Sequence, residues 1–346
     1  MARVYVGLSG GVDSAVSAAL LKEQNHEVTG VFIKIWQPEF IECTWREDRL
    51  DAMRVAAHLG IPFREVDLSD DYKREVIDTM IRDYKAGITP NPDVLCNEKI
   101  KFGSFFDWAI QEGADHIATG HYVRVVERGG TCSLHRGVDI EKDQSYFLYR
   151  IRENDLARSI FPVGSYAKKE IRARAVAFGL RVAAKRDSQG LCFVGDVSIP
   201  DFLSRFVRME RGDVLDTNGE VVGEHDGALA FTIGQRHGFR VRSAEKALYV
   251  VGIHAKRNAI TIDDDLSTAL QSSIRMCDAH WVNSEPKKNK EYVAQARYHG
   301  EKFLARVQKE GDTYAVVVDK PRLFSRGQSL VLYEGDRCVG GGIIDS

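Results

Sequence analysis

A glycine-rich segment near the N-terminus has the composition of a phosphate-binding turn. It comprises Gly7, Leu8, Ser9, Gly10, Gly11, Val12, Asp13 and Ser14, and it lies between an apolar run and an amphipathic one. Adjacent glycines let the backbone approach an anion without interference from Cβ, and a helix that begins here aims free N–H groups at the same point. The segment lacks the lysine of a Walker loop and the spacing of a dinucleotide-binding fingerprint.

What remains is the pattern S-G-G-x-D-S, which resembles the pyrophosphate loop of ATP-pyrophosphatases. These enzymes cleave ATP between the α- and β-phosphates to adenylate a substrate. The resemblance implies that the whole segment binds ATP, that its serines and glycines donate to the polyphosphate, and that Asp13 helps to place Mg²⁺. We expect the adenine against the backbone near Phe32 and Ile33. The simpler alternative is a Gly-Gly turn whose serines cap a helix.

Two of the six cysteines lie in polar segments that we predict to be loops. Cys96 lies in T-P-N-P-D-V-L-C-N (residues 89–97), and Cys192 lies in D-S-Q-G-L-C-F (residues 187–193). A structural cysteine is usually a small buried hydrophobe, whereas a thiolate or persulfide is a strong nucleophile near neutral pH. Each cysteine alone is more simply explained as an incidental thiol. Together with a loop that activates a substrate by adenylation, the pair suggests sulfur transfer.

The elements that must position these residues alternate between strands and helices in the first half of the chain. Short apolar runs predict strands at 4–8, 28–35, 62–66 and 116–119. Amphipathic runs predict helices at 14–24, 47–59, 71–84 and 102–111, with Asp13 as a candidate cap for the first. This alternation is typical of an α/β fold, in which a parallel sheet is covered by helices on both faces.

After about residue 205 the sequence changes to short alternating strands separated by turn signals such as Asn218-Gly219. A chain of 346 residues is long enough for two to three domains. We therefore predict an α/β catalytic domain of the ATP-pyrophosphatase type over residues 1–205. A small β-rich connector would follow over 206–272, and a β-barrel over 273–346.

Composition excludes several classes of protein. Lys and Arg number 48, Asp and Glu 50, and 44% of residues are hydrophobic, which is ordinary for a globular chain and unlike a disordered tail. The N-terminal residues show no basic run followed by an apolar core, so we expect no secretory leader, and no apolar run approaches the roughly 20 residues of a membrane helix. The cysteines form no C-x-x-C pair, so we predict neither a metal-ligand cluster nor a secreted disulfide framework. We expect a cytoplasmic monomer with no membrane partner.

The net charge of −2 hides a basic stretch. Between Lys142 and Arg186 there are eleven Lys or Arg and four Asp or Glu, a local net charge of 11 − 4 = +7, with aromatic residues interspersed. A solvated helix face would explain part of this stretch. Basic side chains also position a nucleic-acid backbone, and aromatic rings stack on exposed bases. We therefore predict phosphate contacts by part of the stretch.

Further motifs extend the resemblance over the whole chain. They are A-T-G-H-Y (118–122), K-D-Q-S-Y-F-L (142–148), F-P-V-G (161–164), D-S-Q-G-L-C-F-V-G (187–195), T-I-G-Q-R-H-G (232–238) and G-G-G-I-I (340–344). With the glycine loop and residues 89–97, they resemble in order the family of bacterial tRNA-specific 2-thiouridylases. These enzymes use ATP to thiolate the wobble uridine of the lysine, glutamate and glutamine tRNAs.

This resemblance implies roles for individual residues. Cys96 would be the nucleophile and Cys192 the persulfide carrier, with a disulfide between them in part of the cycle. Gly120 would contact ATP. Contacts with the target base would come from Asn91, Pro92 and Asp93. Contacts with the tRNA anticodon stem-loop would come from His121, Lys142, Asp143, Gln144, Arg297, Tyr298 and Gln328. The sulfur donor would be a cysteine desulfurase or a sulfur-relay protein.

Two other functions are compatible with parts of the sequence. Another enzyme of the same ATP class, such as a small-molecule amidotransferase or synthetase, would use the glycine loop without needing Cys96 or Cys192. A non-catalytic RNA-binding protein would use the basic stretch and the barrel, with a vestigial loop. The sequence also leaves open whether the persulfide sulfur attacks the base directly or is first freed as hydrosulfide.

Overall fold

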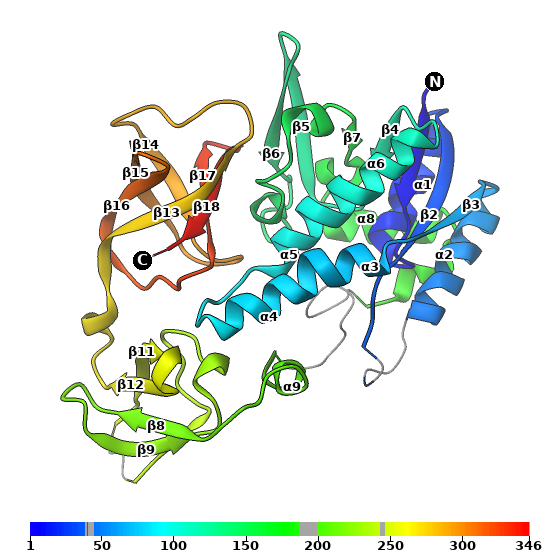
Figure 1. The fold of residues 1–346 in the computed structure, drawn as a ribbon. Coiled ribbons are helices and arrows are strands. Elements are labelled where there is room, and N and C mark those ends of the chain that lie inside the picture. The colour runs from blue at the N-terminus through cyan, green and yellow to red at the C-terminus, as the bar shows by residue number, and fades with distance from the viewer. Residues whose placement is uncertain (39, 41–44, 187–198, 243–245, 346) are drawn as a thin grey trace.

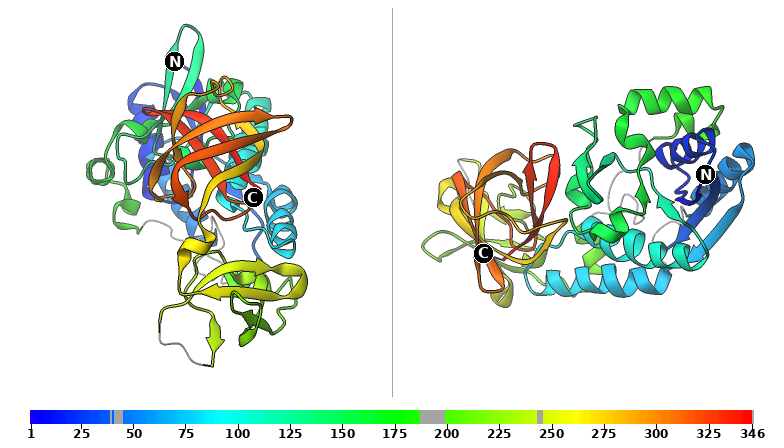
Figure 2. Two further views of the ribbon diagram at one scale, coloured as in Figure 1. Left: turned by 90° about the vertical axis from the view of Figure 1, so that its left-hand side faces the viewer. Right: turned by 90° about the horizontal axis from the view of Figure 1, so that it is seen from above.

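The structure is a computed structural model that describes residues 1–38, 40, 45–186, 199–242 and 246–345. It contains an α/β module, a small β-rich connector and a β-barrel (Figure 1). The parallel sheet and the barrel lie at opposite ends of the molecule (Figure 2). Among the residues described, no helix combines the length and the apolar character needed to cross a bilayer.

A five-stranded sheet of order β3-β2-β1-β4-β7, with parallel pairings throughout, forms the centre of the α/β module. Its strands are β1 (Arg3–Gly7), β2 (Glu27–Lys34), β3 (Phe63–Asp67), β4 (His116–Ala118) and β7 (Ser159–Ile160). Val4 and Val6 of β1 are fully buried, as a central strand covered on both faces requires. The predicted α/β fold with a parallel sheet is confirmed.

Helices cover both faces of this sheet. One face packs against α1 (Val12–Glu23), α2 (Trp45–Leu59) and α8 (Lys168–Ala177). The other face packs against α3 (Ser69–Tyr72), α4 (Asp78–Lys85), α5 (Pro92–Leu95) and α6 (Phe105–Gln111). Two short helices, α7 (Glu153–Leu156) and α9 (Ile199–Ser204), lie further along the chain.

Two helical segments contain π-helical turns that the periodicity did not predict. Lys73–Ile77 joins α3 to α4 within the predicted helix at 71–84, and Cys96–Ser104 joins α5 to α6. The prediction of a loop through residues 89–97 is wrong from Pro92 onward. Asn91 caps the helix there by accepting from the Val94 N–H at 3.4 Å, and a proline suits the first helical position.

A hairpin of β5 (Val123–Arg128) and β6 (Thr131–Arg136) projects from the α/β module, and the sequence analysis did not predict it. His135 of β6 pairs with Arg337 of the barrel strand β18, so the hairpin extends the barrel's sheet. The α/β module and the barrel are therefore joined through backbone pairing as well as side chains.

The connector is a five-stranded sheet of order β10-β9-β8-β12-β11. Its strands are β8 (Gly212–Leu215), β9 (Val221–His225), β10 (Phe239–Val241), β11 (Tyr249–His254) and β12 (Ala259–Asp263). Most neighbours are antiparallel, but β12 pairs with β8 in parallel. The core of the connector is small, and it centres on Val214, Phe231 and Ile260.

The C-terminal barrel closes through six antiparallel strands. They are β13 (Gln271–Trp281), β14 (Glu291–Gln295), β15 (Lys302–Glu310), β16 (Thr313–Arg322), β17 (Ser329–Glu334) and β18 (Arg337–Ile344). The ring runs β13-β16-β15-β14-β17-β18 and is closed by pairing of β13 with β18. A closed barrel leaves no free sheet edge within the ring.

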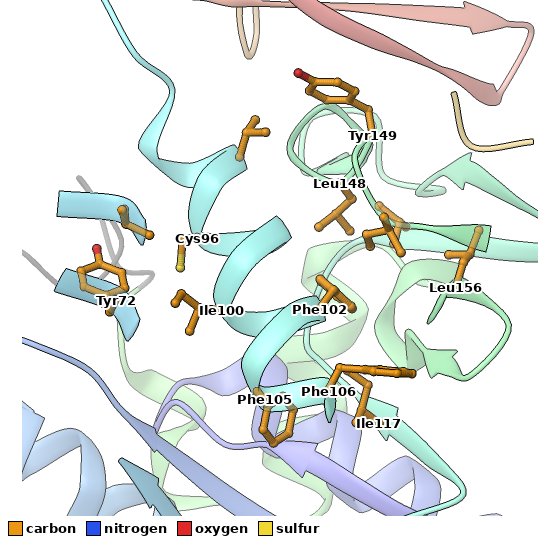
Figure 3. Close-up of a cluster of buried hydrophobic side chains, with 14 of the residues drawn as sticks. Tyr72, Cys96, Ile100, Phe102, Phe105, Phe106, Ile117, Leu148, Tyr149 and Leu156 are labelled. Carbon is orange, nitrogen blue, oxygen red and sulfur yellow. The ribbon is translucent and has the colours of Figure 1, made fainter. Parts of the chain in front are cut away.

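The largest hydrophobic core is shared between the α/β module and the barrel. It contains side chains of the π-helical stretch, among them Cys96, Ile100 and Phe102 (Figure 3). The same cluster includes Tyr333 and Cys338 of the barrel. The helix that carries Cys96 is thus fixed from both modules.

Candidate active site

The predicted phosphate loop connects β1 to α1 at the carboxyl edge of the sheet. Gly10 has φ +73°, and a Cβ there would lie 2.3 Å from the Asp48 carbonyl oxygen, so the position requires glycine. The Ser9 N–H donates to Ser14 Oγ at 3.2 Å, and the two serine hydroxyls are 3.2 Å apart. These bonds curl the loop around the first turn of α1, an arrangement that suits an anion.

Asp13 lies in the first turn of α1, where two neighbours hold its carboxylate. Lys168 Nζ donates to both carboxylate oxygens at 2.8 Å, and Tyr122 OH donates at 2.7 Å. The N-cap residue is Gly11, so the prediction that Asp13 caps α1 is wrong. Sequence reasoning assigned no role to Tyr122. Lys168 belongs to the basic stretch, and its contact with Asp13 places this cation at the glycine-rich loop.

A cavity of about 170 Å³ lies beside the loop, where the chain switches from one side of β1 to the other. Most residues predicted to bind the nucleotide line it, namely Gly7, Leu8, Ser9, Asp13, Ser14, Phe32, Ile33 and Gly120. Gly10, Gly11 and Val12 belong to the loop but are not among the lining residues. His121 and Gln144, predicted to contact tRNA, also line the cavity. Lys101 and Thr119 complete it without having been predicted.

Residues that follow β4 bound the cavity. Gly120 approaches the loop so closely that a Cβ would lie 2.7 Å from the Ser14 nitrogen. The buried His121 ring has Nδ1 2.8 Å from Thr119 Oγ1 and Nε2 3.5 Å from Lys101 Nζ. Burial, and then the charge of Lys101, hold the pKa of His121 well below its usual range. The ring is therefore neutral at neutral pH, with Nε2 available to accept from Lys101.

Cys96 begins the π-helical stretch, and its side chain is only 1% exposed. It lies beside Tyr72 and Ile100 (Figure 3). The prediction that it sits in a loop is wrong, because the helix begins at Pro92 and turns the thiol toward the core. Cys192 lies outside the described residues, as does all of 187–198. The pairing of the two cysteines therefore stays a prediction.

The segment before Cys96 is attached to the barrel. Gln328 Nε2 donates to the carbonyl oxygens of Thr89 and Pro90, each at 3.1 Å. The Thr89 N–H donates to the carbonyl of Arg326 at 2.9 Å. Gln328, predicted to contact tRNA, thus uses its amide donors to hold the loop that leads into Asn91, Pro92 and Asp93.

Asp93 has an unusual environment within this segment. Its Oδ1 atom is buried and has no hydrogen-bond partner in the described structure. A buried polar atom without a partner is costly, so it marks a position that a ligand's donor would satisfy. The family resemblance implies that Asp93 contacts the target base.

Asp143, also predicted to contact tRNA, is turned toward the interior. Its carboxylate accepts from Arg136 Nη1 at 2.7 Å, from Ser145 Oγ at 3.0 Å, and from two backbone N–H groups. The side chains of Asp143 and Arg136 are 4% and 6% exposed. The guanidinium of Arg136 lies 3.5 Å from the ring centroid of Tyr333, in the barrel. Asp143 therefore stabilises the junction between the two modules.

The remaining predicted tRNA contacts lie nearer the surface. Lys142 is half-buried and Arg297 is exposed. The ring of Tyr298 lies on that of Phe147, with centroids 4.4 Å apart, and against His299 at 4.1 Å. Burial, with the carboxylates of Asp143, Asp139 and Asp93, raises the pKa of Tyr298 to about 12. The aromatic group thus lies close to Asp93 in the segment that is predicted to contact the target base.

Much of the predicted basic stretch is engaged within the protein. Arg150 pairs with Glu98 at 2.6 Å, and Lys185 pairs with Asp48 at 2.8 Å and with Asp51 at 2.7 Å. Other members of the stretch remain exposed, namely Lys169, Arg181 and Arg186. The local charge of +7 is therefore only partly available to a nucleic acid.

Three family models match the chain in succession. They are the tRNA methyl transferase HUP domain over residues 2–196, the tRNA methyl transferase PRC-barrel domain over 200–264, and the aminomethyltransferase beta-barrel domain over 271–344. Solved structures that resemble the chain include the U34-tRNA thiolase NcsA from Methanococcus maripaludis with its [4Fe-4S] cluster. The TM-score is 0.37 at 20% identity, covering 60% of this chain and 64% of that one. At that TM-score the likeness supports no functional conclusion.

Curated relatives give the stronger comparison. The tRNA-specific 2-thiouridylase MnmA of Bacillus subtilis (strain 168) is 41% identical, over 99% of this chain and 95% of that protein. The protein of the same name from Pseudomonas aeruginosa (strain UCBPP-PA14) is 41% identical over 99% and 94%. With this identity over almost the whole of both sequences, the chain belongs to the family of bacterial tRNA-specific 2-thiouridylases.

Proposed function

We propose that this chain catalyses the ATP-dependent 2-thiolation of the wobble uridine in the lysine, glutamate and glutamine tRNAs. The observation that carries the proposal is that the helical stretch beginning at Cys96 also lines the cavity beside the phosphate loop, through Lys101. Adenylation followed by sulfur transfer requires that a nucleotide and a thiol both lie close to the same carbonyl group of the substrate. The names of the curated relatives support the same activity.

In this proposal ATP occupies the cavity, with its polyphosphate on the loop from Gly7 to Ser14 and its adenine near Ile33 and Gly120. Mg²⁺ in nucleotide sites is usually held by one or two carboxylates together with phosphate oxygens and water. Asp13 offers a carboxylate beside the loop, which it shares with Lys168. This arrangement suits an ion that arrives with ATP and takes most of its ligands from the phosphates.

The target uridine must leave the base stack for its C2 to be reached. Uracil O2 then attacks the α-phosphorus of ATP, the bond to the bridging oxygen breaks, and pyrophosphate leaves. The N3 proton of the uracil must depart in the same step. Asp93 supports this chemistry, because its unpartnered Oδ1 is a carboxylate acceptor of the kind that an N3–H group requires.

Sulfur transfer follows from the adenylate. The terminal sulfur of a persulfide on Cys192 attacks C2, and the C2–O bond breaks with release of AMP. The Cys96 thiolate then attacks Cys192 Sγ, which frees 2-thiouridine and leaves a Cys96–Cys192 disulfide for an external thiol to reduce. If hydrosulfide is released first, Cys96 attacks the persulfide before C2 is attacked, and the products are the same. The persulfide would be supplied by a cysteine desulfurase or a sulfur-relay protein.

We further propose a division of labour along a monomeric chain. Residues 1–205 carry the chemistry, 206–272 connect, and 273–346 grip the anticodon stem-loop. Arg297 and Tyr298 support this division, since Tyr298 packs on Phe147 close to the base-contacting segment. His121 and Gln144 line the cavity and so suit contact with the inserted nucleotide, whereas Lys142 suits its backbone.

One assay tests the proposal and its two alternatives. The protein is incubated with ATP, a persulfide donor and unmodified tRNA, and both AMP and thiolated tRNA are measured. We expect both products in equal amounts and only with tRNA present. AMP release that does not depend on tRNA would favour a small-molecule synthetase, and tight tRNA binding without AMP would favour a non-catalytic RNA-binding protein. Cys277→Ser, a change of a half-buried barrel cysteine, is the control for Cys96→Ser.

A further inference from the structure

Lys101 lies between the two halves of the proposed reaction. It follows Cys96 by five residues in a π-helical stretch, whose N–H groups bond to carbonyls five residues earlier, as the Phe105 N–H does to Ile100. The backbones of Cys96 and Lys101 are therefore on adjacent turns. Among the described residues that line the nucleotide cavity, Lys101 is the single lysine, and none is an arginine.

Neighbouring groups direct the Lys101 ammonium. His121 Nε2 lies 3.5 Å from Lys101 Nζ, and the Nδ1 atom of that ring lies 2.8 Å from Thr119 Oγ1. Thr119 is in turn fixed by its carbonyl, which accepts from Ser17 Oγ at 3.5 Å. The imidazole thus helps to hold the Lys101 ammonium at the cavity wall.

The position of Lys101 relative to the expected nucleotide indicates which phosphate it faces. Ser9 and Ser14 of the loop line the cavity, and so does Ile33, near which we expect the adenine. The α-phosphate connects these two ends of ATP. Lys168, which binds Asp13, and Lys185, which donates to the Gly10 carbonyl, also lie close to the loop, but neither lines the cavity.

We infer that Lys101 is a catalytic residue that contacts the α-phosphate and stabilises its charge while uracil O2 attacks. The inference rests on the proposed function. As the new O–P bond forms and the bond to pyrophosphate breaks, negative charge gathers on the non-bridging oxygens of the α-phosphate. A preorganised ammonium in a partly enclosed site favours that transition state over the ground state. Lys101 donates hydrogen bonds and neither gains nor loses a proton.

The test compares Lys101→Met with Lys99→Met in the full-length protein. Lys99 lies two residues away on the same helical stretch, is 42% exposed and pairs with Glu98, so it matches the change without touching the cavity. Rates of tRNA-dependent pyrophosphate release are measured at saturating ATP, and ATP affinity is measured separately by calorimetry. We expect Lys101→Met to lower the rate roughly 100- to 1,000-fold while ATP affinity changes less than about fivefold. Lys99→Met should match the unsubstituted protein.

A second variant guards against loss of folding. Lys101→Ala removes the side chain, and added ethylammonium should restore at least a tenth of the lost rate if a cation at this point is what the reaction needs. A Lys101→Met rate within threefold of the unsubstituted protein would overturn the inference, as would a loss that saturating ATP restores. If the unsubstituted protein itself releases no pyrophosphate with tRNA, the proposed function fails, a result distinct from an active protein that tolerates Lys101→Met.

Discussion

Replacing Asp143 with asparagine should loosen the junction between the α/β module and the barrel. The substitution keeps the shape of the side chain and removes the charge that faces Arg136, whose side chain is 6% exposed. The amide oxygen can still accept from the N–H groups of Gly137 and Ser145, but the amide NH2 group then faces the Arg136 guanidinium, which now donates to the carboxylate. Breaking a buried ion pair costs about 3–5 kcal/mol. That range corresponds to a roughly 150- to 5,000-fold change in the equilibrium for local opening.

The thiol of Cys338 reports this opening. Cys338 is fully buried and pairs across the sheet with Tyr333, on which Arg136 stacks. Burial raises the pKa of Cys338 to about 12. The reactive thiolate therefore forms, and meets a thiol reagent, only when the junction opens. The rate of Cys338 labelling, measured from the mass of the labelled peptide, should be roughly 150 to 5,000 times higher in Asp143→Asn than in the unsubstituted protein.

A matched control separates this effect from a general loss of charge. Asp336 pairs with Arg124 near the same junction, but its side chain is 62% exposed, and such pairs contribute about 0–1 kcal/mol. Asp336→Asn should therefore change the labelling rate by less than about fivefold. A labelling rate in Asp143→Asn within threefold of the unsubstituted protein would refute the structural role. Weakened tRNA binding with unchanged labelling would instead favour the direct tRNA contact implied by the family resemblance.

Cys96→Ser or Cys192→Ser should abolish thiolation and leave tRNA affinity within a few-fold, measured on mercury-containing gels and by filter binding; full activity in either variant would rule out the two-cysteine mechanism. Gly10→Ala should weaken ATP binding at least tenfold, because Gly10 has φ +73° and the added Cβ meets the Asp48 carbonyl. Gly129→Ala, at φ +60° with open space around it, should leave ATP affinity unchanged in the same calorimetric titration. The pKa of His121 is lowered in the folded protein, so below about pH 6.5 the unfolded chain takes up a proton at this residue and the folded chain does not. The neutral, buried His121 therefore favours the folded state fully above about pH 6.5, and this stabilisation is lost as the pH falls. His121→Gln should therefore flatten the fall of the melting temperature between about pH 6.5 and 5, and equal slopes would contradict the assignment.

The parallel sheet was predictable because its strands carry apolar residues on both faces, as in β1, where Val4 and Val6 are fully buried. Two local signals were present but not used. Asn91-Pro92 is a helix start, with a capping residue followed by proline at the first position. Gly129-Gly130, between alternating strands, is a two-residue hairpin turn. The prolines of residues 89–97 were interpreted as loop residues although a proline also starts helices, and the glycine pair was given no interpretation.

The site was predictable only in part. The loop from Gly7 to Ser14 is contiguous, so its composition and its position after a strand were enough to predict it. The contacts that set its electrostatics are not contiguous: Lys168 is 155 residues from the Asp13 it binds, and Gln328 is 239 residues from Thr89. Such pairs depend on how modules pack, which the pattern of one sequence does not specify. For the same reason, charge counting does not show which members of the basic stretch are available to a nucleic acid, because Arg150 and Lys185 have partners elsewhere in the fold.

The hydrophobic core that crosses from the α/β module into the barrel has a consequence for how the chain can be divided. Three family models match the sequence as separate segments, yet Tyr146 and Tyr149, each at most 1% exposed, share one cluster with Val331, Tyr333 and Cys338 of the barrel. Cutting before the barrel would leave that aromatic surface in water and would open the sheet edge of the β5–β6 hairpin. The two end modules should therefore unfold as one cooperative unit, while the connector, with its own small core, is free to unfold separately.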